Sequence, residues 1–337
     1  MDKRERLEKE IEELKATLAK CLEKRLLTDD PEKEVKLEAL ENSLDAKVQQ
    51  KERELAQLSD TSTSRNRNAL DLEEGLCNLD FDEPKAIVQD ILKCLNQNEG
   101  GSALFLMENC LEMEGRLLLR RVRDILKTNT SQFFEYPVEF IPTLPANRVV
   151  FLKILGGWMG LSFDEFAEEE TEEESEQQIA KAIEKVVKKI SELLRSGTTI
   201  LIPLTNWKSL SLNYQATFLD WFINQFWQAL TSAVEQAMQD YSPRVFFIIM
   251  VKESMVEACK KVDYFCCSTE FDGGKLLILP LRCWTKTDVQ RWLSSYSSKI
   301  KKSERDRLVE YIFGSNDEEL PLKVRIELER AHAQSLF

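Results

Sequence analysis

The first 58 residues carry two stripes of apolar positions separated by a polar break. Within each stripe the apolar residues recur mostly three or four positions apart, the spacing of one helix face. The stripes include Leu7, Ile11, Leu14 and Leu18, and then Leu37, Leu40, Leu44 and Leu55. The break, Thr28-Asp29-Asp30-Pro31, suits a helix cap and a first helical turn. The pattern predicts an antiparallel helical hairpin, or short coiled coil, over residues 1–58.

Two narrow stripes bury little surface within an isolated hairpin. We therefore expect residues 1–58 to bind another protein, either an effector or a second copy of the chain. A solvated helical arm held by i,i+4 charge pairs is the alternative. Residues 59–69 are polar and lack periodicity, which predicts a linker.

Short apolar runs alternate with amphipathic segments over residues 70–300. Strands are expected at 102–107, 138–141, 198–204, 245–251 and 275–281. Helices are expected at 83–97, 115–126, 145–159, 177–195, 212–239 and 287–297. Strands without two-residue alternation that are separated by helices favour a mainly parallel sheet of about five strands, covered on both faces. The result is a three-layer α/β domain, followed by C-terminal helices in 301–337, at 304–313 and 321–333.

Two segments leave alternatives open. The acidic run at 168–176 is typical of a solvated loop, although it could dock a basic partner. The helix at 212–239 is rich in aromatic residues, which favours core packing but could also form a recognition surface. Its aromatic residues are Phe218, Trp221, Phe222, Phe226 and Trp227.

The composition narrows the possible partners. A net charge of −13 and a pI near 4.9 argue against nucleic-acid binding and against anionic membrane surfaces. The N-terminus is charged at once, and no apolar run approaches the roughly 18 residues of a membrane span. We therefore expect a cytoplasmic protein with neither a signal peptide nor a membrane anchor.

Histidine, the usual general base of nucleophilic catalysis, occurs once in the chain. The single histidine, His332, lies near the end of the chain, so a Ser/His/Asp or Cys/His unit is not expected. None of the eight cysteines forms a CxxC pair, and no metal site is predicted. Most cysteines are expected to be buried reduced thiols, while the adjacent Cys266 and Cys267 leave a redox role open.

The junction after the strand at 102–107 is where a phosphate-binding P-loop would lie. The motif G-x-x-x-x-G-K-[ST] supplies backbone amides, a lysine for the phosphates and a hydroxyl for Mg²⁺. At the matching positions of this chain, Cys110 replaces the first glycine and Gly115 keeps the second. Arg116 replaces the lysine, and Leu117 replaces the residue with the hydroxyl. Three glutamates in the same segment add negative charge that repels polyphosphate.

A second metal-binding position is also altered. An active NTPase ends a later strand with an aspartate that holds Mg²⁺. Here the strand at 198–204 is followed by Thr205 and Asn206, so neither position supplies an anionic ligand. The altered positions predict a degenerate nucleotide site that does not organise Mg²⁺, although Gly115 and Arg116 leave a weak anion contact possible.

With these residues, the chain over 70–300 resembles the inactive members of the STAND class, the signal-transduction ATPases with numerous domains. The resemblance is carried by Leu79-Asp80-Phe81, the altered loop at 108–116, the strands at 200–204, 246–251 and 276–281, and Trp284 through Leu293. Active members carry a sensing arginine after the fourth strand, whereas this chain has Val251-Lys252-Glu253-Ser254.

The resemblance implies a P-loop NTPase-like fold without catalysis or cofactor, in a bacterial, and especially cyanobacterial, conflict or defence system. It also implies that the N-terminal hairpin is an adaptor that recruits a separate effector, with the α/β domain as scaffold or sensor. Two alternatives remain: a weak NTPase that uses Arg116, and a coiled-coil oligomerisation protein.

Overall fold

The computed structural model describes residues 72, 75–79, 81–141, 146–163, 172–296 and 301–333. Contacts divide the chain into two units, Met1–Glu73 and Glu74–Phe337, and the fold below belongs to the second. The hairpin predicted at 1–58, its two apolar stripes and the linker at 59–69 lie outside the described residues.

The second unit contains a seven-stranded sheet in which every pairing is parallel. Its order is β2-β4-β5-β1-β7-β6, and β3 pairs with β4 as well. The strands are β1 (Gly101–Met107), β2 (Gln132–Glu135), β3 (Val138–Glu139), β4 (Thr198–Thr205), β5 (Arg244–Met250), β6 (Phe265–Cys266) and β7 (Leu276–Ile278). All seven residues of β5 are buried, as expected for a strand covered on both faces.

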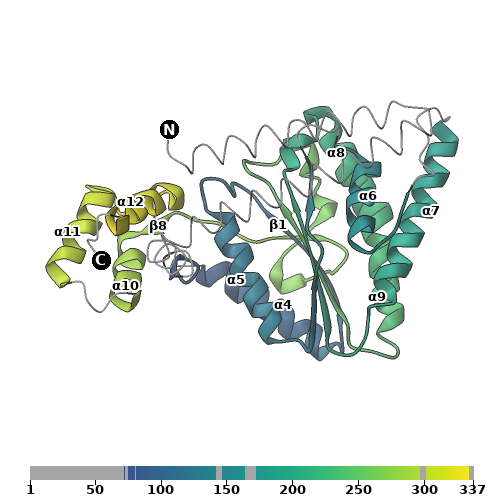
Figure 1. The fold of residues 1–337 in the computed structure, drawn as a ribbon, viewed down its shortest axis with the longest axis horizontal. Helices are drawn as coiled ribbons and strands as arrows, with labels where there is room; N and C mark the ends of the chain where they lie inside the picture. The colour runs from purple at the N-terminus through teal and green to yellow at the C-terminus, as the bar shows by residue number, and fades with distance from the viewer. Residues whose placement is uncertain are drawn as a thin grey trace, which may run out of the picture. The chain divides into compact units, whose positions relative to one another are not determined.

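Helices cover both faces of this sheet and give the predicted three layers (Figure 1). The helices α4 (Asp82–Gln97) and α5 (Gly115–Thr128) lie on one face. The other face is covered by α6 (Arg148–Trp158), α7 (Glu172–Ser191), α8 (Leu212–Trp221) and α9 (Gln228–Ala237). The predicted α/β fold with a mainly parallel sheet is confirmed.

The sheet has two short strands that the sequence pattern did not predict. The β2 strand is only four residues long and ends at Glu135, whose carboxylate accepts hydrogen bonds of 2.7 and 2.5 Å from the Arg123 side chain. The β6 strand has two residues and forms the edge beside β7. Both are short strands placed by their pairing with a neighbour, β2 with β4 and β6 with β7.

The expectation that the acidic run at 168–176 is a loop is wrong for its second half, because α7 begins at Glu172. Negative charges are favoured in the first turns of a helix. Glu176 also forms an ion pair with Arg148 of α6 at 2.6 Å. The first half of the run lies outside the described residues.

The aromatic segment of the predicted helix at 212–239 is part of the core. It contains a π-helical insertion, Phe222–Trp227, between α8 and α9. The five aromatic residues named above are all buried against the sheet and α6. Core packing, not surface recognition, is therefore their role.

The C-terminal part of the unit is a small helical group. The strands β8 (Trp284–Thr285) and β9 (Glu318–Glu319) pair antiparallel, and the helices are α10 (Lys286–Tyr296), α11 (Lys302–Phe313) and α12 (Pro321–Ala333). In the part of the chain that the structure describes, no helix is both long and apolar enough to cross a membrane.

Candidate functional site

The degenerate loop, residues 108–114, joins β1 to α5 at the carboxyl end of the central strand. Parallel α/β sheets bind their ligands at this end. The segment after β5 and the segment after β4 emerge at the same end of the sheet. The loop therefore lies where a P-loop would lie.

The backbone amides at the start of the loop are already hydrogen-bonded within the chain. A phosphate-binding loop directs several successive N–H groups at its anion. Here the amides of Asn109, Cys110 and Leu111 donate to the carbonyls of Glu253, Val251 and Lys252, at 2.8, 2.9 and 3.2 Å. The chain after β5 thus holds the start of the loop in place and occupies the amides of residues 109–111.

The second half of the loop is closed on itself. The amide of Met113 donates to the Asn109 carbonyl at 3.0 Å, and the amide of Gly115 donates to the Cys110 carbonyl at 2.9 Å. The Leu117 amide, in the first turn of α5, donates to the Glu114 carbonyl at 2.8 Å. An anion could bind these groups only if the loop were rebuilt.

Gly115, which the sequence marked as the surviving P-loop glycine, is needed here for packing. A Cβ at this position would lie 2.6 Å from Sγ and 2.7 Å from Cβ of Cys110. The Cys110 thiol is buried and donates to the Met107 carbonyl at 3.3 Å. Burial raises the pKa of this thiol to about 12, so it is a neutral packing group.

Replacing Gly115 with alanine is expected to destabilise the protein by about 1–3 kcal/mol, because the added methyl overlaps Cys110. Gly157 is the matched control. It lies in α6, and an added Cβ there meets no atom within 4 Å. Gly157→Ala should be neutral or stabilising by up to about 1 kcal/mol. Equal urea midpoints for the two variants would contradict the packing role.

A buried ion pair joins the loop to the C-terminal helix α12. Glu114 precedes α5 in a left-handed conformation, φ 53°, and its carboxylate is buried. Arg325 Nη1 donates to Glu114 Oε2 at 2.8 Å, and the Leu322 amide donates to the Glu112 carbonyl at 2.9 Å. The negative charge of Glu114 is therefore paired within the chain itself.

The other predicted site residues are placed as follows. Arg116 is exposed on α5, whereas Leu117 is buried. Thr205 ends β4, which is separated from β1 by β5. Asn206 follows it with φ 58°, and its Nδ2 donates to Glu139 Oε1 at 2.7 Å and to the Phe140 carbonyl at 3.1 Å. The Asn206 amide thus links the ends of β3 and β4.

Of the predicted site residues, Cys110 and Gly115 are in contact. No described hydrogen bond joins Thr205 or Asn206 to this pair. Among the residues that the structure describes, no three His, Cys, Asp or Glu side chains gather in a way that could hold a metal ion. The arrangement is a self-bonded loop with the exposed side chain of Arg116 beside it.

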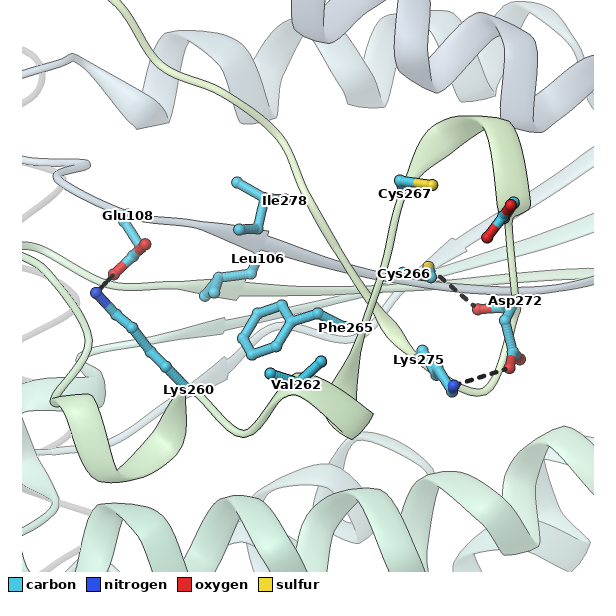
Figure 2. Close-up of a pocket in the computed structure, with 11 residues that line it drawn as sticks. Leu106, Glu108, Lys260, Val262, Phe265, Cys266, Cys267, Asp272, Lys275 and Ile278 are labelled. Carbon is cyan, nitrogen blue, oxygen red and sulfur yellow. Dashed lines mark hydrogen bonds and ion pairs between the residues drawn. The ribbon is translucent and has the colours of Figure 1, made fainter.

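A cavity that the sequence did not predict lies next to the loop, and its volume is about 640 Å³ (Figure 2). Glu108, the first residue after β1, forms part of its wall. The Glu108 carboxylate accepts from the Met255 amide at 2.6 Å and lies 4.0 Å from Lys260 Nζ. The adjacency of Cys266 and Cys267, which also line the cavity, was its only signal in the sequence.

Comparison with known proteins places these observations in a family. No curated protein matches the chain. The family model described as inactive STAND matches residues 76–250, which is more than half of the chain. The match covers β1, the degenerate loop, α5 and the strands β2 to β5. The chain therefore belongs to the inactive STAND family.

Proposed function

We propose that this protein is a non-catalytic adaptor or sensor in a bacterial signalling or defence system. In this proposal the hairpin at 1–58 engages an effector protein, and the α/β domain serves recognition and scaffolding. Membership of an inactive family supports the non-catalytic part of the proposal. The adaptor part rests on the two apolar stripes of the hairpin.

One observation carries the proposal: the loop is bonded to the chain and to itself, because residues 251–253 accept from the amides of residues 109–111 and the amides of Met113, Gly115 and Leu117 donate to carbonyls within the loop. Electrostatic stabilisation by amides, lysine and Mg²⁺ is the main source of phosphoryl-transfer catalysis. In this domain the amides of Met113, Gly115 and Leu117 already donate within the loop, and buried Leu117 replaces the hydroxyl that would hold Mg²⁺. The domain retains a rigid α/β body that can present surfaces to other proteins.

Titration of the full-length protein with ATP and Mg²⁺ tests the non-catalytic part. We expect no saturable heat of binding and no release of phosphate above buffer. The variant Arg116→Ala should behave identically, because Arg116 is exposed and has no phosphate to contact. Micromolar binding with phosphate release that Arg116→Ala abolishes would instead support the weak-NTPase alternative.

The adaptor part is tested by affinity capture with the full-length protein as bait. The stripe variant Leu14→Asp/Leu44→Asp should lose the captured effector, because charges on the apolar stripe oppose helix packing. Lys15→Asp/Lys47→Asp is the matched control and should retain it. Light scattering of the same proteins separates an effector from self-association. If light scattering shows that the stripe variant no longer forms oligomers, and it loses no captured effector, the coiled-coil oligomerisation alternative is supported.

A further inference from the structure

The cavity beside the degenerate loop has an apolar floor made by three adjacent strands. Leu106 of β1 pairs in register with Ile278 of β7, and Phe265 of β6 lies at the same edge. Val262, from the short helical turn before β6, lies at the rim and is 87% exposed. A volume of about 640 Å³ is within the range that binds small molecules.

Charges of both signs surround this floor. Lys260 lies 4.0 Å from Glu108, and Lys275 lies 4.0 Å from Asp272. Glu270 adds a third carboxylate to the lining. Figure 2 shows the Lys260–Glu108 pair and the Lys275–Asp272 pair at opposite ends of the cavity. Such a lining is complementary to a zwitterionic ligand, which carries both ammonium and carboxylate groups.

The two cysteines in the lining have different surroundings. Cys266 is half-buried, and its thiol is directed at the Asp272 carbonyl oxygen, 3.7 Å away (Figure 2). Cys267 is exposed, and its Sγ lies 3.1 Å from the Thr269 hydroxyl. Consecutive side chains of an extended segment point to opposite sides, which disfavours a bond between the two sulfurs.

Their acidities differ accordingly. Hydrogen bonds from the Thr269 hydroxyl and from the Glu270 backbone amide lower the pKa of the Cys267 thiol. Burial raises the pKa of the Cys266 thiol. Because the thiolate is the reactive form, Cys267 is the nucleophile of the pair near neutral pH, and Cys266 stays protonated.

We propose that this cavity is a covalent modification site, in which Cys267 forms a mixed disulfide with a low-molecular-weight disulfide of zwitterionic, amino-acid or peptide character. The Cys267 thiolate attacks one sulfur of the disulfide RS–SR. The S–S bond breaks, a bond forms between Cys267 Sγ and that sulfur, and RS⁻ departs and takes a proton from water. Cys267 is oxidised, the departing half is reduced, and no further oxidant is needed. The proposal does not depend on the adaptor function.

Oxidised glutathione is a suitable probe for the full-length protein. A Cys21→Ser background removes the cysteine outside the described residues. After timed incubation, intact mass and peptide mapping give the rate at each cysteine. We expect the first adduct at Cys267, formed about tenfold faster than at half-buried Cys283, because the rate rises with the thiolate fraction. The rate at Cys267 should also rise at lower pH than that at Cys283, whose pKa is raised by burial.

Three variants distinguish binding of the disulfide in the cavity from simple solvent exposure of the Cys267 thiol. Cys267→Ser should abolish the adduct, and the control Cys283→Ser should retain it. Lys275→Glu should slow the reaction with oxidised glutathione but not with the neutral 2-hydroxyethyl disulfide, because only the former has carboxylates to bind. The proposal is overturned if Cys283 reacts as fast as Cys267, or if Lys275→Glu slows the reaction with both reagents equally or with neither. It is also overturned if Cys266 and Cys267 form a disulfide with each other, seen as a loss of two hydrogens.

Discussion

Replacing Phe151 with alanine is expected to lower the free energy of unfolding by about 3–5 kcal/mol. The Phe151 ring on α6 is fully buried, at 0% exposure. Five other aromatic rings have centroids between 5.0 and 6.2 Å from it, and they belong to Phe218, Trp221, Phe222, Phe226 and Phe247. Alanine would leave a cavity between α6, the α8–α9 segment and the sheet, which these large rings cannot collapse to fill.

Urea unfolding followed by tryptophan fluorescence measures this effect. Tyr311→Ala is the matched aromatic deletion, because the Tyr311 side chain on α11 is 67% exposed. Its free energy of unfolding should change by no more than about 0.5 kcal/mol. If Phe151→Ala were as mild as Tyr311→Ala, the aromatic cluster would not be the centre of the core.

Replacing Arg325 with alanine is the second change with a large expected effect, a loss of about 1.5–3 kcal/mol. The substitution leaves the Glu114 carboxylate, which is 5% exposed, buried without its guanidinium partner. The loss falls below that of a fully buried pair because the Arg325 side chain is 30% exposed and water screens the charge.

Replacing the partner residue, Glu114, should lower the free energy of unfolding less than Arg325→Ala does. Glu114→Gln removes the charge but can still accept a hydrogen bond, and Arg325 keeps its pair with Glu329 at 2.7 Å. The double variant should therefore be more stable than the sum of the two single losses predicts. Arg330→Ala, which breaks the exposed pair with Glu327 on the same helix, is the control. Hydrogen exchange of α12 gives a second measurement: it should rise in Arg325→Ala and stay unchanged in Arg330→Ala.

Much of the fold could be predicted because its strands are long apolar runs. The segments at 102–107, 198–204 and 245–251 became β1, β4 and β5, and the helices between them began within a few residues of their expected starts. The β2 strand could not be predicted in this way, because its four residues owe their placement to β4 and to the Arg123–Glu135 pair. The π-helical insertion could not be predicted either, because the spacing of its apolar residues does not distinguish it from the α-helix on each side.

The candidate site was predictable only at the level of residue types. The absence of a hydroxyl at Leu117 and of a carboxylate at Thr205 and Asn206 is visible in the sequence. The closure of the loop is not, because it depends on hydrogen bonds between residues 109–111 and 251–253, which are distant in the chain. Glu114 and Arg325 are also distant in the chain, and the packing role of Gly115 appears only when Cys110 is placed beside it.

The strand order also dictates when the domain can assemble during synthesis on the ribosome. Gly101 pairs with Arg244 and Leu104 pairs with Leu276, so β1 leaves the exit tunnel long before either neighbour has been translated. Contacts between such distant segments form slowly. Until β5 and β7 emerge, the apolar β1 segment has two unpaired edges that can associate with other nascent chains. Chaperone occupancy on translating ribosomes should consequently persist until residues beyond Ile278 are exposed.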